Sequence, residues 1–435
     1  MQDRLFKERL RAFCVEAAMQ LAYDAENGEQ VPYDLVDAGP ADGKHQPLWC
    51  YRTLTGEFIR QRLGALGMLP SYLPAALAIE KMEGLNEWLL ARGEQHVPNT
   101  VRDRADATLR VFLAEVLGED SNFEFDESRF QSAWNALEAI LIEGHSLTLL
   151  AAPIHGIEIE SLEIRLDNNM MLVSAESIEA EALPGDIFRA DSLGLPVVAV
   201  VIEAEDNSPE GLEQARIRLR KLLCALRLFG SASPALGGAA RLQVERGPWQ
   251  VMGLEGSGSA RGVLAIETRQ EHELESFCRL VANRWPRGGE IAWALRRHEF
   301  GCDRMHYLDG LSDHLLALRA LLEPEGPMSG HLTDRLAALC AEPNDRARLA
   351  ERAARAAGLE RTIVAGLANR ETQAEQLCIE MEMHLRALLK DVICQHLDSD
   401  LVTLADMILA QSAGIEQPVK KRRLGFGDGA DPLAA

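Results

Sequence analysis

Apolar residues in the last third of the chain recur every three or four positions, the spacing that places side chains on one face of a helix. The clearest case is the segment 303–322, which we predict to be an amphipathic helix. Its apolar stripe consists of Leu308, Leu311, Leu315, Leu318 and Leu322. The prolines Pro324 and Pro327 predict the end of this helix, because proline cannot continue the hydrogen-bond ladder.

The same pattern predicts further helices downstream. Their expected ranges are 330–340, 345–357, 359–367, 372–396 and 400–409. Ser329 and Asn344 are expected to cap two of them, and Ser399 or Asp400 the last, because such side chains accept hydrogen bonds from free backbone amides. Gly358 is expected in the left-handed conformation that commonly ends a helix.

The spacing of apolar residues changes near residue 146, where apolar and polar residues begin to alternate as they do in half-buried strands. Strand-like runs occur at 147–151, 157–160, 162–166, 170–173, 196–203, 240–244 and 263–268, with helical patterns at 210–229 and 271–283. The first third of the chain is mostly helical and begins with an amphipathic segment at 3–24.

These patterns predict an α+β protein that is predominantly α. We expect a helical N-terminal region (1–145), an α/β middle domain (146–288), a C-terminal helical bundle (289–412) and a disordered basic tail (413–435). The tail is rich in glycine, proline and charge, a composition that cannot bury a core. Its run Lys420–Arg423 looks like a nuclear import signal, with a solvated basic tail as the alternative.

The order of the C-terminal helices resembles the Apea-like branch of the HEPN domains. The residues that carry this resemblance are Leu315–Gly326, Leu332–Leu339 and Ile363–Gly366, with Leu222–Phe229 extending it into the middle region. It thus covers about residues 146–412. The resemblance implies a bundle with a long leucine-rich first helix, a turn with Glu and Gly, two short helices and a long closing helix.

The resemblance also implies where an active site would lie. In this family an arginine is followed four to six residues later by a histidine, and the pair cleaves RNA without a metal. Aligning Ile363, Val364 and Gly366 with the family pattern puts Glu360 at the arginine and Ala365 at the histidine. Keeping Arg361 as the arginine puts Gly366 at the histidine instead. The motif is therefore degenerate, and we predict no catalytic residues.

Other residues that could form such a motif do not fit it. Arg92 and His96 are too close in sequence and are predicted to be surface residues. A non-standard nuclease site would need Arg361 and His384 to meet across two helices. This arrangement defines the alternative function, an RNA-cleaving toxin or antiviral-defence effector.

The charge of the chain restricts its partners. It carries 45 basic and 67 acidic residues, a net charge of -22, which opposes sequence-independent contact with phosphates over the whole surface. One local exception is a set of seven arginines: Arg335, Arg346, Arg348, Arg352, Arg355, Arg361 and Arg370. We take Arg346, Arg348, Arg352, Arg355 and Arg361 as candidates for RNA binding, with a helix face paired to acidic neighbours as the alternative.

Neither a metal nor a cofactor is predicted. Cys302 and His306 lie four positions apart, with Asp303 and His298 nearby, but no second pair of ligands is evident and a closed zinc site needs about four. The glycine-rich segment 253–262 lacks the Gly-Lys-Ser/Thr of a phosphate loop and predicts a hairpin connection. The 8 cysteines are scattered without a C-x-x-C pair, which indicates reduced thiols in a cytoplasm.

The sequence favours a non-enzymatic interaction or sensor protein with a degenerate HEPN-like domain and an RNA or protein partner. We expect no membrane span, because no apolar run approaches eighteen residues. No secretion signal is expected at the N-terminus. A homodimer is expected, because the helix 372–396 carries a second apolar set in Cys378, Ile379, Ala387 and Cys394.

Overall fold

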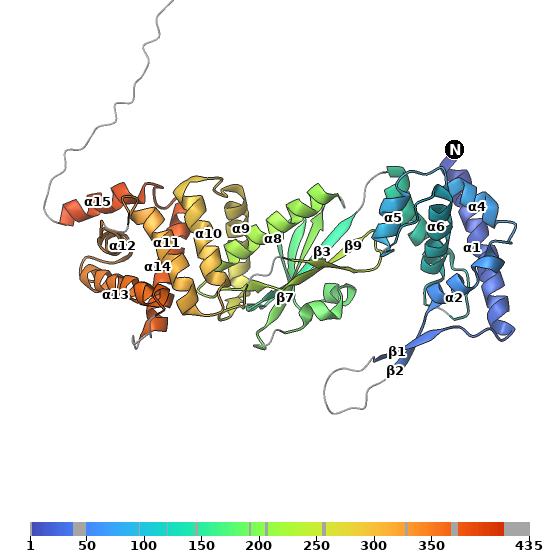
Figure 1. The fold of residues 1–435 in the computed structure, drawn as a ribbon, viewed down its shortest axis with the longest axis horizontal. Helices are drawn as coiled ribbons and strands as arrows, with labels where there is room; N and C mark the ends of the chain where they lie inside the picture. Colours follow the sequence, from blue (N-terminus) through green and yellow to red (C-terminus); the bar gives the residue numbers. More distant parts are fainter. Residues whose placement is uncertain are drawn as a thin grey trace, which may run out of the picture.

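The computed structural model describes residues 2–37, 49–94, 96–119, 121–143, 147–190, 193–204, 208–254, 258–326, 329–366 and 373–412. It is mostly helical and contains an antiparallel sheet, which confirms the α+β class. The structure is elongated, with N-terminal helices at one end, the sheet in the middle and the C-terminal helices at the other end (Figure 1). No described helix is long and apolar enough to cross a membrane.

The N-terminal helices enclose a core of their own. They are α1 (Gln2–Glu26), α2 (Thr55–Gln61), α3 (Leu63–Leu66), α4 (Tyr72–Ile79), α5 (Leu85–Ala91), α6 (Val101–Leu117), α7 (Glu127–Glu138) and a π-helical turn, η1 (Ala139–Glu143). Phe13, Trp88, Phe112 and Trp134 are buried together in this core. An antiparallel hairpin, β1 (Tyr33–Asp37) and β2 (Trp49–Thr53), extends from it, in a region for which the sequence predicted mostly helices.

The main sheet follows. Its strands are β3 (Thr148–His155), β5 (Glu163–Asp167), β6 (Met170–Val173), β7 (Val197–Ala204), β8 (Ala235–Leu236), β9 (Ala239–Val244) and β10 (Gln250–Gly253). The same region contains the strands β4 (Ile157–Ile159) and β11 (Leu264–Ile266) and the short helical segments η2 (Ile178–Ala182), η3 (Gly185–Phe188) and η4 (Thr268–Gln270). The order β10-β9-β3-β7-β6-β5 is antiparallel throughout, with β8 also paired to β3. β3 pairs with β7 from Thr148 opposite Ala204 to His155 opposite Val197. β4 and β11 form a separate parallel pair.

Two helices join this sheet to the C-terminal helices. They are α8 (Pro209–Phe229) and α9 (Glu271–Asn283). Ser208 caps α8 as its sequence predicts, accepting a hydrogen bond from the Gly211 amide at 3.0 Å. α8 buries Leu219, Leu222 and Leu226 in a hydrophobic core that also contains residues of the sheet and of the C-terminal helices. The domain boundary predicted at residue 288 therefore does not interrupt the described core.

The C-terminal helices are α10 (Gly289–Asp303), α11 (Tyr307–Leu322), α12 (Leu332–Cys340), α13 (Arg346–Val364), α14 (Ala374–Cys394) and α15 (Leu401–Ser412). The predicted helix 303–322 begins instead at Tyr307, after a break that separates it from α10, a helix that the sequence analysis missed. Asp400 caps α15 as expected, accepting from the Thr403 amide at 3.0 Å.

Several predicted helix ends are wrong. Gly358 does not end a helix: it lies within α13, and the separate helix predicted at 359–367 is the continuation of α13 to Val364. His331 rather than Ser329 occupies the N-cap position of α12, and Asp345 rather than Asn344 that of α13. The predicted tail 413–435, with the run Lys420–Arg423, lies outside the described residues, as does Arg370.

Candidate functional site

The segment expected to carry the nuclease motif lies at the end of α13. Glu360, which stands at the arginine position in one alignment, is buried and pairs with Arg319 of α11. The Arg319 guanidinium donates to both carboxylate oxygens, at 3.2 Å from Nη1 to Oε1 and 2.7 Å from Nη2 to Oε2. This two-point contact joins two helices of the bundle. The Glu360 carboxylate is therefore buried and held in an ion pair between two helices.

The remaining motif positions lie at the exposed end of the same helix. Ala365 is the C-cap residue and Gly366 follows with a positive φ of 67°, which a glycine adopts easily. Arg361 is exposed, and its Nε contacts the Ala357 carbonyl of its own helix at 3.4 Å. His384 of α14 is partly buried, and burial lowers its pKa. Within the described part of the chain, no hydrogen bond joins Arg361 to His384.

The five arginines proposed to bind RNA do not form one surface. Arg346 donates to the Ser412 hydroxyl at 2.5 Å, and Arg352 pairs with Glu380 of α14. Arg348 is exposed and pairs with Asp345 at 3.2 Å. Arg355 and Arg361 are also exposed. At about 100° per residue, Arg348 and Arg355 share a helix face, whereas Arg361 lies about 120° away from Arg355.

A surface groove of about 420 Å³ lies between α13 and α14 beside this face. It is lined by Arg348, Arg352, Gln376, Ile379, Glu380 and Met383. Arg335, the other described member of the arginine set, lies away from any such surface. It is buried and pairs with Glu325 and Asp406, each at 2.8 Å. Among the described arginines of the set, Arg348 and Arg355 are both exposed and share one face of α13.

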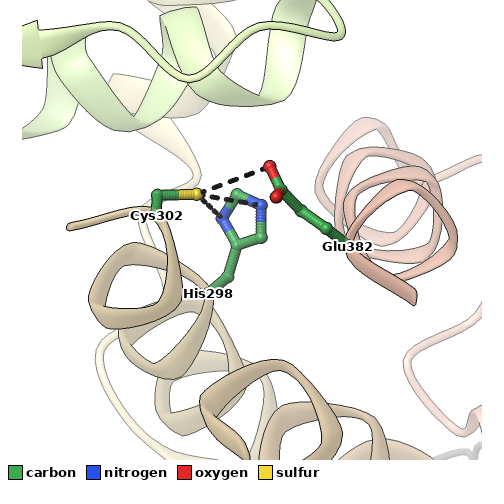
Figure 2. Close-up of side chains that lie close together, drawn as sticks. All are labelled: His298, Cys302 and Glu382. Carbon is green, nitrogen blue, oxygen red and sulfur yellow. Dashed lines mark hydrogen bonds between the residues drawn. The ribbon is translucent and has the colours of Figure 1, made fainter. Parts of the chain in front are cut away.

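A second cluster of chemically active side chains lies in the core of the C-terminal region. It consists of His298 and Cys302 of α10 and Glu382 of α14, which point toward one another across the two helices (Figure 2). His298 and Cys302 share a face of α10 because they are four residues apart. The Cys302 sulfur lies 3.7 Å from His298 Nε2 and 3.9 Å from Glu382 Oε1. All three side chains are buried.

Glu382 is also bound by residues from outside the three. The Ser233 hydroxyl donates to Oε1 at 2.9 Å, Arg386 donates to Oε1 at 2.5 Å, and Arg261 donates to Oε2 at 3.2 Å. Burial tends to raise the pKa of this carboxyl group, but His314, Arg261, Arg386 and His298 hold the pKa of Glu382 below its usual value. Glu382 is therefore a buried carboxylate that joins the segment after α8, the segment before β11 and α14.

The histidines of this cluster are enclosed by close helix packing. Burial lowers the pKa of His298 to about 3, so its imidazole is neutral at ordinary pH. The ring of His314 on α11 stacks on that of His298 with 5.8 Å between the centroids. A side chain at Gly301 would overlap the His314 ring, since an added Cβ would lie 2.1 Å from Nε2. The glycine thus lets α11 approach α10.

The structure separates residues that the sequence analysis had considered together. His306 is exposed at the start of α11, and Asp303 pairs with Arg227 of α8 at 2.7 Å, so neither joins Cys302 and His298. The third member of the cluster is Glu382, which lies 80 residues away in sequence. The i, i+4 spacing of His298 and Cys302 was the available signal, and no local pattern identified Glu382.

Arg92 is also placed differently from its prediction as a surface residue. Its side chain is buried and pairs with Glu115. It donates to the Val244 carbonyl at 3.0 Å and so connects α5 to the end of β9.

Comparison of the chain with protein-family models, curated proteins and solved structures finds no match.

Proposed function

We propose that this protein is a non-enzymatic interaction or sensor protein whose C-terminal helices form a degenerate HEPN-like bundle. The observation that carries the proposal is the pair between Glu360 and Arg319, which uses a motif position for packing between helices. Ala365 and Gly366, at the alternative histidine positions, have no side chain that could transfer a proton. The segment thus supports a bundle that retains a binding surface without ribose activation.

RNA is the partner class that the arginines of α13 favour. Arg348 and Arg355 are exposed on one face, and the groove between α13 and α14 begins at Arg348. Guanidinium groups contact phosphates well because they donate in a planar fork. On a chain with a net charge of -22, contact would be confined to this face.

A cleavage assay tests the non-enzymatic part of the proposal. The full chain is incubated with total RNA and with tRNA in the presence of a chelator, and we expect no cleavage. Arg361→Ala serves as the comparison, because Arg361 is the remaining arginine of the degenerate motif. Robust cleavage that disappears in Arg361→Ala would overturn the proposal in favour of an RNA-cleaving effector.

A binding assay tests the choice of partner. The double variant Arg348→Glu, Arg355→Glu is compared with Arg60→Glu, Arg216→Glu, which makes the same charge change at exposed arginines elsewhere. We expect only the first variant to lose affinity for a labelled single-stranded RNA. Two phosphate contacts predict a slope of log affinity against log salt of about -1.4. Equal losses in both variants would mean that this face does not bind RNA, and a protein partner would then be sought.

A further inference from the structure

We propose that His298, Cys302 and Glu382 form a binding site for one divalent transition metal ion of the zinc class. The inference is independent of the function proposed above. One imidazole nitrogen, the thiol sulfur and one carboxylate oxygen lie within 4.8 Å of one another, all buried. These are the three ligand types that zinc accepts in proteins.

The separations between the donor atoms fit a shared ion. With metal bonds of about 2.3 Å to sulfur and about 2.0–2.1 Å to nitrogen, two ligands of one zinc ion lie about 3.5–3.8 Å apart. The Cys302 sulfur is 3.7 Å from His298 Nε2 and 3.9 Å from the carboxylate oxygen of Glu382 (Figure 2). These two separations are close to those of a shared ion, whereas the imidazole nitrogen and the carboxylate oxygen, which lie within 4.8 Å of each other, would have to approach for all three to bind it.

His314 gives a second, independent observation. Its side chain is only 1% exposed, and neither ring nitrogen has a hydrogen-bond partner among the described residues. Buried polar atoms normally have partners, so two unpartnered nitrogens beside His298 call for an explanation. In a neutral imidazole one ring nitrogen carries a lone pair, and a cation at the site would attract that lone pair.

The two arginines on Glu382 determine how tightly the ion is held. Oε1, the oxygen 3.9 Å from the sulfur, accepts from Ser233 and Arg386, so an ion bound at Oε1 would displace the Arg386 hydrogen bond; Oε2 accepts from Arg261. Binding forms a metal–sulfur bond and releases the Cys302 thiol proton to solvent. The site then gains one net positive charge beside two guanidinium groups, which opposes binding. Ser233 holds the carboxylate in place as an outer-shell partner.

This arrangement predicts opposite effects for two neighbouring variants. Ser233→Ala removes a hydrogen bond that orients the ligand and should weaken metal binding about 10- to 100-fold. Arg386→Gln removes a competing cation and frees a lone pair on Oε1, so it should strengthen binding about tenfold or more. A cluster that serves only as an internal salt bridge would show no metal binding to strengthen.

Because the site is closed to solvent, the ion must enter as the chain folds. The full, tag-free chain is therefore expressed in medium supplemented with zinc or with cobalt and purified under reducing conditions. We expect about one ion per chain and, in the cobalt protein, a sulfur-to-cobalt absorption band in the near ultraviolet. Cys302→Ser should lose this band, whereas Cys14→Ser, a buried cysteine of the N-terminal core, should keep it.

Unfolding temperatures with and without metal give a test that does not depend on any variant, because they can be measured on the wild type alone. Wild-type protein that contains metal should unfold at a higher temperature than wild-type protein stripped by unfolding and refolding with a chelator. His298→Gln should unfold at the same temperature with and without added metal. The proposal is overturned if the wild type purifies without metal, if Cys302→Ser keeps the cobalt band, or if stripping leaves the unfolding temperature unchanged.

Discussion

Glu360 lies in the core of the helical region and pairs with Arg319 of the neighbouring helix. Its carboxylate and the Arg319 guanidinium are both largely removed from solvent, and their two hydrogen bonds join α13 to α11. Removing one partner of such a pair leaves the other charge buried without compensation. We expect Glu360→Ala to lower the free energy of unfolding by about 3 kcal/mol, measured by urea denaturation.

An exposed pair on the same helix provides the control. Arg348 and Asp345 lie 3.2 Å apart, but their side chains are 75% and 53% exposed. Solvent screens such a pair, so Arg348→Ala should change stability by no more than about 0.5 kcal/mol. Equal effects of the two substitutions would show that the buried pair does not stabilise the bundle. Arg319→Ala combined with Glu360→Ala should cost less than the sum of the single changes.

The two candidate sites differ in how far their residues could be identified from sequence. That Ala365 and Gly366 have no side chain able to transfer a proton follows from their identity alone. The pairing of Glu360 with Arg319 could not be predicted, because the two residues lie 41 positions apart on different helices. For the same reason the contact of Glu382 with Cys302 and His298 could not be predicted, although the spacing of Cys302 and His298 within α10 could be read from the sequence. Local patterns determine which residues share a face, while the fold determines which faces meet.

At the scale of elements, alanine substitutions at two helical glycines probe how closely the helices pack. Gly301 lies in α10 against the His314 ring, and an added Cβ would be 2.1 Å from its Nε2. Gly358 lies in α13 with open space around the same position. Gly301→Ala should therefore separate α10 from α11 and lower the free energy of unfolding by about 3 kcal/mol. Gly358→Ala should raise it by about 0.5–1 kcal/mol, because alanine favours the helix.

Circular dichroism during thermal or urea unfolding measures both glycine variants. A Gly301→Ala protein as stable as wild type would show that α10 and α11 can move apart at little cost. The contrast between the two sites also explains the wrong helix end at Gly358. A glycine permits a left-handed turn without requiring it, and the buried Leu359 and Glu360 beyond it keep the chain helical.

The ion pairs between α12 and its neighbours predict that the stability of the folded state depends on pH. Arg335 of α12 pairs with Glu325, which precedes this helix, and with Asp406 of α15. Hydrogen bonding from Arg335 lowers the pKa of Glu325 to about 2, below its ordinary value of 4.5. The folded state therefore binds its proton more weakly than the unfolded state does. The resulting stability is present above pH 4.5 and is lost as the pH falls toward 2.

Unfolding temperatures between pH 6 and pH 2.5 test this dependence. Wild type should lose more stability over the acidic part of this range than Glu325→Gln, which cannot titrate at this position. Asp334→Gln, at an exposed carboxylate of the same helix, should follow wild type. Parallel curves for wild type and Glu325→Gln would show that the pair with Arg335 does not contribute to stability.

For the whole molecule, the amino-acid pattern predicted the order of helical and sheet regions along the chain better than it predicted the contacts between those regions. The change from helical to alternating patterns near residue 146 marks the start of the sheet at Thr148. The patterns did not indicate that one core continues from β3 to α15. They also did not indicate that Arg92 links α5 to the end of β9. Such contacts join residues far apart in sequence, so no periodic signal records them.

The predicted homodimer also concerns the whole molecule. Of the second apolar set on α14, Cys378 is buried within the chain, Ile379 and Cys394 are partly buried and Ala387 is exposed. Met383 lies one turn before Ala387 and is 49% exposed, in the groove beside α13. A second chain that packs on these residues would bury the remaining apolar surface of α14. A specific interface of this kind typically buries about 800 Å² per partner.

Light scattering at micromolar concentration measures this assembly directly. We expect the mass of two chains for wild type and the mass of one chain for Met383→Glu, because a buried charge without a partner opposes association. Met19→Glu is the matched control, since Met19 is 68% exposed and belongs to α1, a helix at the opposite end of the molecule from α14 (Figure 1). It should remain a dimer. A wild-type mass of one chain that persists on concentration would mean that α14 is already sufficiently covered by its own chain.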